Sequence, residues 1–73
     1  MARHIHIFRT ELNTDESIAV LKETMNQHPD ISRWHLDLED VDKVLKVETD
    51  SLSEACIISL AGENQIFCEV LPD

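Results

Sequence analysis

The hydrophobic pattern of this chain switches repeatedly between the two-residue period of a β-strand and the 3.6-residue period of an α-helix. Residues 3–8 alternate as a strand, residues 15–27 carry apolar side chains at helical spacing, and residues 31–38 alternate again. The second half repeats the same kinds of element: a short strand over 43–48, a helix that Ser53 caps and that runs through Ala61, and a strand over 65–71. The pattern therefore predicts the element order β-α-β-β-α-β.

Residues at the ends of the two predicted helices favour caps. Asn13 stands at the expected N-cap of the first helix, and Glu16 follows three residues later, where its side chain can reach back. Pro29 ends the first helical pattern, and Gly62 lies just beyond the second as a stop signal. These residues predict where both helices begin and end.

Split β-α-β units in this order typically form a ferredoxin-like fold. We therefore expect an α+β sandwich, in which a four-stranded antiparallel sheet of order 4-1-3-2 carries two helices on one face. With 73 residues, the chain has enough material for one domain with a small core. We expect residues 1–73 to form a single ferredoxin-like domain.

Three segments follow a hydrophobic pattern that one known family shares. The turn at 28–31 is similar to a Leu-Pro-Gly-Val turn, residues 34–39 to a Val-x-Val-x-Leu-x second strand, and residues 44–47 to the strand that follows. Over nearly its whole length the chain thus resembles a heavy-metal-associated domain, the module of copper chaperones and of the amino-terminal repeats of metal-transporting ATPases. The resemblance implies the same ferredoxin-like fold.

The metal-binding feature of that family is missing. Heavy-metal-associated domains hold soft Cu(I) or Zn(II) with a Met-x-Cys-x-x-Cys loop between the first strand and the first helix. Residues 9–15 occupy this position and contain no cysteine, and Gln65 stands where such domains usually have Gly. The chain also resembles small stand-alone bacterial proteins of this cysteine-free kind, through residues 34–40 and the pair that begins at Cys68. The metal ligands of the family therefore cannot be carried over to this chain, and we expect no cofactor.

The charge of the chain narrows the classes of partner. Six Lys and Arg stand against fifteen Asp and Glu, for a formal net charge of -9. Such a surface repels nucleic acid and anionic membranes, which basic patches bind.

No apolar run is long enough for a signal peptide or a membrane span, so we expect a cytoplasmic protein. Cys56 and Cys68 are too few for a disulfide scaffold, and we expect both to be reduced, buried thiols.

Two groups of residues could bind a metal without cysteines. His4 and His6 lie two apart on one strand face, where His35 or a carboxylate could complete a site. The acidic run at 37–42 lacks the ligand register of a calcium loop and is typical of a solvated hairpin tip. We assign no metal ligands, and we keep a metal-binding or metal-trafficking protein with His and carboxylate ligands as the alternative function.

The sequence contains no recognisable catalytic motif. No Ser-His-Asp or Cys-His spacing is recognisable, and the single glycine belongs to no phosphate-binding motif. We therefore expect no enzyme activity and assign no catalytic residues.

The remaining feature is the sheet face that the helices leave uncovered. We expect an inward set of Ile5, Ile7, Leu45, Val47, Ile66, Cys68 and Val70. The outward set then forms a candidate interaction face of His6, Phe8, Val44, Phe67 and Leu71. Long neighbours such as Lys46 and Arg33 could instead cover this patch. We favour a non-catalytic interaction domain that binds a protein partner or a second copy through this face. A regulatory domain that senses a small ligand at a subunit interface is a further alternative.

Overall fold

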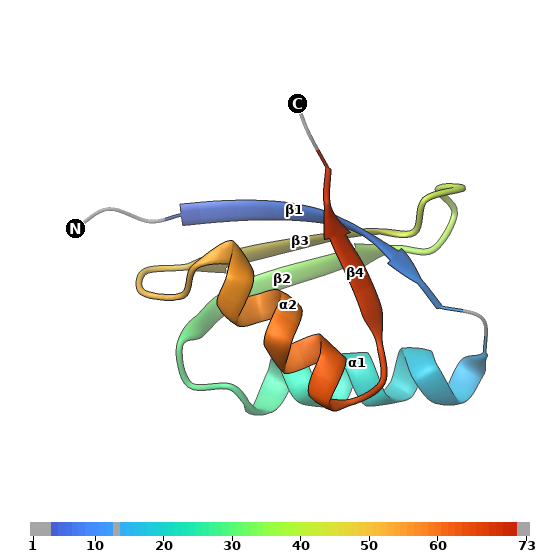
Figure 1. The fold of residues 1–73 in the computed structure, drawn as a ribbon, viewed down its shortest axis with the longest axis horizontal. Helices are drawn as coiled ribbons and strands as arrows, with labels where there is room; N and C mark the ends of the chain where they lie inside the picture. The colour runs from blue at the N-terminus through green and yellow to red at the C-terminus, as the bar shows by residue number, and fades with distance from the viewer. Residues whose placement is uncertain (1–3, 13, 72–73) are drawn as a thin grey trace.

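The six elements of this chain follow the predicted order in a computed structural model, which describes residues 4–12 and 14–71 (Figure 1). They are β1 (His4–Glu11), α1 (Asp15–Gln27), β2 (Ile31–Asp37), β3 (Val44–Thr49), α2 (Glu54–Glu63) and β4 (Phe67–Val70). The strands pair antiparallel in the order β2-β3-β1-β4, and both helices lie on the same side of the sheet. The predicted ferredoxin-like fold is confirmed.

Helix α1 covers the predicted residues but begins from a different cap. The Oγ1 atom of Thr14 accepts a hydrogen bond from the backbone N–H of Ser17 at 3.1 Å. Thr14 is therefore the N-cap, and the prediction of Asn13 in that role is wrong; Asn13 itself lies outside the described residues. The helix buries Leu21 and Met25 one turn apart against the sheet, as its apolar spacing predicts.

Helix α2 has the predicted cap, because the hydroxyl of Ser53 accepts from the N–H of Cys56 at 3.2 Å. It runs past Gly62 to Glu63, so Gly62 is not its stop. The N–H of Ile66 instead donates to the carbonyl of Ala61 at 2.9 Å, and the N–H of Gln65 donates to that of Gly62 at 3.0 Å. This is a Schellman ending whose left-handed residue is Gln65, at φ 62°.

The core lies between the helices and the sheet face beneath them, which we call the covered face. Its fully or nearly fully buried apolar side chains are Phe8, Leu12, Leu21, Met25, Leu45, Val47, Ile57, Ala61, Ile66 and Cys68. Thr49 is also buried there, and its Oγ1 donates to the carbonyl of Asp30 at 2.7 Å while accepting from the N–H of Leu52 at 3.2 Å. Every buried polar side-chain atom in the described part of the chain has a partner.

Strand β1 faces the opposite way from the prediction. Ile5, predicted in the core, is 55% exposed, whereas Phe8, predicted outside, is completely buried. Phe8 pairs with Leu45 of β3 and shares its face, and Ile7 pairs with the exposed Lys46. The inward placement of Ile5 and Ile7 is therefore wrong. Among the other predicted core residues, Val70 points to the covered face but stays 37% exposed at its rim.

One structural finding bears on membranes. Within residues 4–12 and 14–71, neither helix combines the length and the apolar character needed to cross a bilayer.

Candidate functional site

The face of the sheet turned away from the helices, which we call the open face, carries apolar side chains from β1, from β3 and from β4 with the residue after it. Strand alternation and register place five there, which we call the apolar patch: Ile5, Ile7, Val44, Phe67 and Leu71. Ile5 and Phe67 are 55% and 54% exposed. Ile7 and Leu71 are neighbours, because the N–H of Leu71 donates to the carbonyl of Ile7 at 2.9 Å. Apolar surface is therefore continuous from Ile5 and Ile7 to Leu71, whereas Phe67 lies on the far side of the Arg9–Glu69 pair.

Charges of both signs lie around the apolar patch and also between its members. An ion pair joins Arg9 of β1 to Glu69 of β4 at 3.0 Å, and a looser one joins Arg33 of β2 to Glu48 of β3 at 3.8 Å. The hydrogen bonds that Arg9 donates to the Glu69 carboxylate raise the pKa of the Arg9 guanidinium further above its already high value. Exposed pairs of this kind add little stability but hold long side chains in place. Lys46 and Arg33 do not conceal Ile5 and Phe67, which stay more than half exposed.

The predicted interaction face is partly corrected. Val44, Phe67 and Leu71 do lie on the open face. His6 and Phe8 lie on the covered face, and the prediction that they point outward is wrong. The residues that take their place are Ile5 and Ile7.

The sequence does contain a signal that predicts which side chains of β1 point to the open face. Continuing the alternation past Phe8 puts Arg9 and Glu11 on the side of Ile7, and it puts Leu12 on the side of Phe8. Two charged side chains need water, so they fix the open side of β1.

The histidines do not form one cluster. The rings of His4 and His6 stack with centroids 6.0 Å apart, on the covered side of β1 beside the start of α2. The Nε2 atom of His6 lies 2.9 Å from the carbonyl oxygen of Leu52, so it acts as a donor there and leaves only Nδ1 to bind a metal. His35 points to the opposite face of the sheet. The idea that His35 shares a side with His4 and His6 is wrong.

Glu54 is a carboxylate that shares a cavity with the two histidines. It lines a shallow cavity of about 310 Å³ together with His4, His6 and the loop at 51–53. Within the described residues, however, no group of three or more His, Cys, Asp or Glu side chains is arranged to hold a metal ion. The two imidazoles therefore have no completed ligand set around them.

The acidic hairpin between β2 and β3 uses carboxylates to build its own turn. Oδ1 of Asp37 accepts from the N–H of Glu39 at 3.1 Å, and Oδ1 of Asp40 accepts from the N–H of Asp42 at 2.8 Å. Lys43 then adopts φ 46°, and its carbonyl accepts a 2.7 Å bond from Thr10. These contacts give the acidic residues a role in the turn, as Asx turns typically do.

The two cysteines differ in their surroundings. Cys68 is buried in the core as expected, whereas Cys56 is exposed in the first turn of α2, so the expectation that both are buried is wrong. Hydrogen bonds from the Ser53 side chain and backbone lower the pKa of the Cys56 thiol. Burial raises the pKa of the Cys68 thiol.

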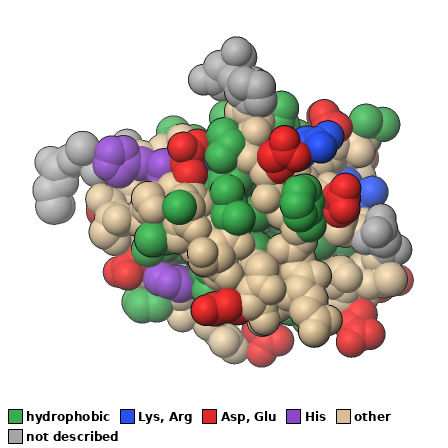
Figure 2. Space-filling view, in the orientation of Figure 1, with side chains coloured by type: hydrophobic (Ala, Val, Ile, Leu, Met, Phe, Trp, Pro, Cys, Tyr) green, Lys and Arg blue, Asp and Glu red, His purple; other side chains and the backbone are tan. Residues whose placement is uncertain are grey.

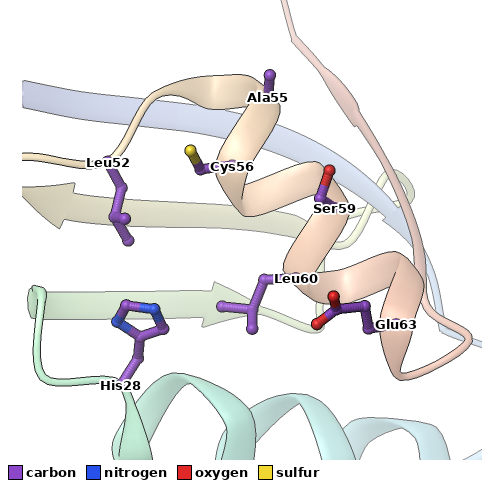
Figure 3. A pocket seen from close by; sticks show the side chains of 7 residues that line it. All are labelled: His28, Leu52, Ala55, Cys56, Ser59, Leu60 and Glu63. Carbon is purple, nitrogen blue, oxygen red and sulfur yellow. The ribbon is translucent and has the colours of Figure 1, made fainter.

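A groove between α2 and the end of α1 was not anticipated from the sequence. Its volume is about 430 Å³, and its lining is His28, Leu52, Ala55, Cys56, Ser59, Leu60 and Glu63 (Figure 3). Figure 3 shows that the ring of His28 rises from one side, while Cys56 and Leu60 come from α2 on the other. No local pattern marks this groove, because its residues come from separate segments of the chain.

Comparison with known proteins gives a match in structure only. No protein-family model and no curated protein sequence matches the chain. A solved structure that it resembles is the copper transporter domain Ccc2a of yeast, determined in solution in apo and Cu(I)-loaded states. The two align with a TM-score of 0.77 over 99% of each chain at 16% sequence identity. The chain therefore has the fold of a heavy-metal-associated domain.

Proposed function

We propose that this protein is a non-catalytic interaction module that binds another protein surface through the open face. The observation that carries the proposal is the apolar patch, whose most prominent members, Ile5 and Phe67, are each more than half exposed. Neither helix covers this side of the sheet. Several exposed apolar side chains gathered on one face of a small domain are typical of a protein interaction site.

The composition of the open face supports this function. Protein interfaces favour aromatic side chains and Arg at their centres and polar groups at their rims. Phe67 supplies an aromatic side chain, and Arg9 lies diagonally across from it on the neighbouring strand. The strands hold these groups on a hydrogen-bonded sheet, so little conformational entropy is lost when a partner docks.

The alternative, metal binding through His4 and His6, has weaker support. A stable site needs three or four ligands, and His6 offers a single nitrogen once Nε2 donates to Leu52. The fold is shared with a copper transporter domain, but the residues between β1 and α1 include no thiol. We therefore place the function on the open face rather than at the histidines.

Site-specific photo-crosslinking tests the proposal. A benzoylphenylalanine placed at Phe67, on the open face, is irradiated in cells that express the protein. The same probe placed at Val41, which is 92% exposed at the tip of the β2–β3 hairpin, is the control. We expect a discrete covalent adduct from position 67 and none from position 41. No adduct from position 67, or equal adducts from both positions, would contradict the proposal.

A further inference from the structure

The charge distribution indicates what covers the open face. We propose that its occupant is a second copy of this chain, so that two sheets pack face to face in a symmetric dimer. This inference rests on the proposed function, because it names the partner of the same surface.

The open face is close to neutral in an otherwise strongly acidic molecule. Its cations are Arg9, Arg33 and Lys46, and its carboxylates are Glu11, Asp37, Glu48 and Glu69. Three against four gives a formal charge of -1 on this face. The whole chain has -9, so -8 lies elsewhere. Figure 2 shows Asp and Glu side chains scattered over the visible surface, while the visible Lys and Arg side chains gather at one end.

This distribution selects among classes of partner. A basic protein would be drawn to the surface that carries most of the negative charge, which lies away from the open face. A second copy is itself acidic and can approach without strong repulsion only through its near-neutral face. Stacking the two open faces points both acidic surfaces outward. The charges thus favour self-association at the apolar patch.

The charges within the open face also suit a self-complementary contact. In a two-fold dimer the same patch occurs on both sides, so each face must tolerate its own copy. Cations and carboxylates alternate across the strands, as in the pairs Arg9 with Glu69 and Arg33 with Glu48. Two copies of a face with a single sign of charge would repel each other. The open face carries both signs, so two copies of it can pack together.

The size of the open face determines how tightly we expect the dimer to bind. The apolar patch, the seven charged residues and His35 come to about half of the 20–30 residues that a partner contributes to a stable interface of standard size. We therefore expect a reversible dimer with a dissociation constant of the order of micromolar.

Sedimentation velocity of the purified full chain over a concentration series tests the inference. We expect a monomer–dimer equilibrium that strengthens between about 20 and 500 mM salt, because salt screens the repulsion between two acidic molecules. Phe67→Ser and Ile5→Ser should each weaken the dimer about tenfold or more, the effect of losing a hot-spot side chain. Val41→Ser, an equally apolar-to-polar change off the open face, should leave it unchanged. Circular dichroism confirms that each variant is folded.

Three results would overturn the inference: a monomer at every concentration and salt, a dimer that both open-face variants leave intact, or a dimer that salt weakens. Crosslinking then separates this failure from that of the proposed function. If the purified chain is monomeric but the probe at Phe67 captures a different protein, only the second-copy inference fails. If the chain is monomeric and the probe captures nothing, both fail.

Discussion

The two faces of the sheet both carry apolar side chains, but folding uses only one set. On the covered face, Phe8, Leu45 and Val47 are completely buried beneath the helices. On the open face, Ile5 and Phe67 keep more than half of their surface in water. Burying apolar surface stabilises by roughly 25 cal/mol per Å². The covered face has already gained this free energy in folding, whereas the open face can gain it only by binding.

Truncating one phenylalanine on each face should give the largest difference in folding stability between the two faces. Phe8→Ala should destabilise the protein by about 3–5 kcal/mol, because it leaves a cavity in the core. A domain of this size has a total stability of about 4–11 kcal/mol, so much of the variant should be unfolded. Phe67→Ala, the same change on the open face, should cost less than about 1 kcal/mol. Urea titration monitored by the fluorescence of Trp34, at low protein concentration, measures both. Equal losses would mean that the two faces are not distinct.

Thr49→Val should have the next largest effect. The change removes a buried hydroxyl that donates to the Asp30 carbonyl and accepts from the N–H groups of Ser51 and Leu52, so three backbone groups lose a partner. We expect a loss of about 1–3 kcal/mol. The matched control is Thr24→Val, in which the hydroxyl lost is bonded only to the Val20 carbonyl one helical turn earlier. If the control loses as much stability in the same titration, the covered face does not depend on this polar contact.

Gln65→Gly should stabilise the protein slightly, by about 0.5–1 kcal/mol. Gln65 holds φ 62° at the end of α2, a conformation that costs a residue with a Cβ atom and suits glycine. This position belongs to neither face, so the variant should raise the unfolding midpoint without changing dimerisation. Gln65→Ala is the control, since it keeps the Cβ atom. If both variants gained the same stability, the positive φ of Gln65 would not be the cause of the gain.

The smallest effect should be on thiol chemistry. Cys56 should react with iodoacetamide faster than Cys68, because it is exposed and its pKa is lowered, whereas burial shields Cys68 and raises its pKa. Ser53→Gly removes the hydroxyl beside the Cys56 thiol at little cost to the cap, and it should slow that reaction a few-fold near neutral pH. Ser53→Thr keeps a hydroxyl and should react at the original rate. Mass spectrometry of the alkylated peptides reports each rate, and a faster reaction at Cys68 would reverse the assignment.

The order of elements could be predicted from the sequence because each depends on local periodicity. Residues 15–27 form α1 as their spacing indicates, and Ser53 caps α2. The end of α2 could not be placed from Gly62, because the left-handed residue is Gln65 and nothing in that side chain signals φ 62°.

Residues 4–8 alone do not predict which side of β1 points toward the helices. Ile5 and Ile7 alternate with His6 and Phe8, so both sides of this stretch contain apolar residues. Only pairing with β3 and the charges at Arg9 and Glu11 decide which side meets the helices. The groove beside His28 and Cys56 depends on how α1 and α2 pack, which is a property of the assembled fold.

Native mass spectrometry of the purified protein, with and without added Zn(II) and Cu(I), tests the central claim most directly because one spectrum reports both subunit count and bound metal. We predict a dimer that forms without metal, and that Phe67→Ser converts to a monomer while Val41→Ser does not. A monomer that retains one metal ion, and that loses it on His4→Ala or His6→Ala, would contradict the claim and move the functional site from the open face to the histidines.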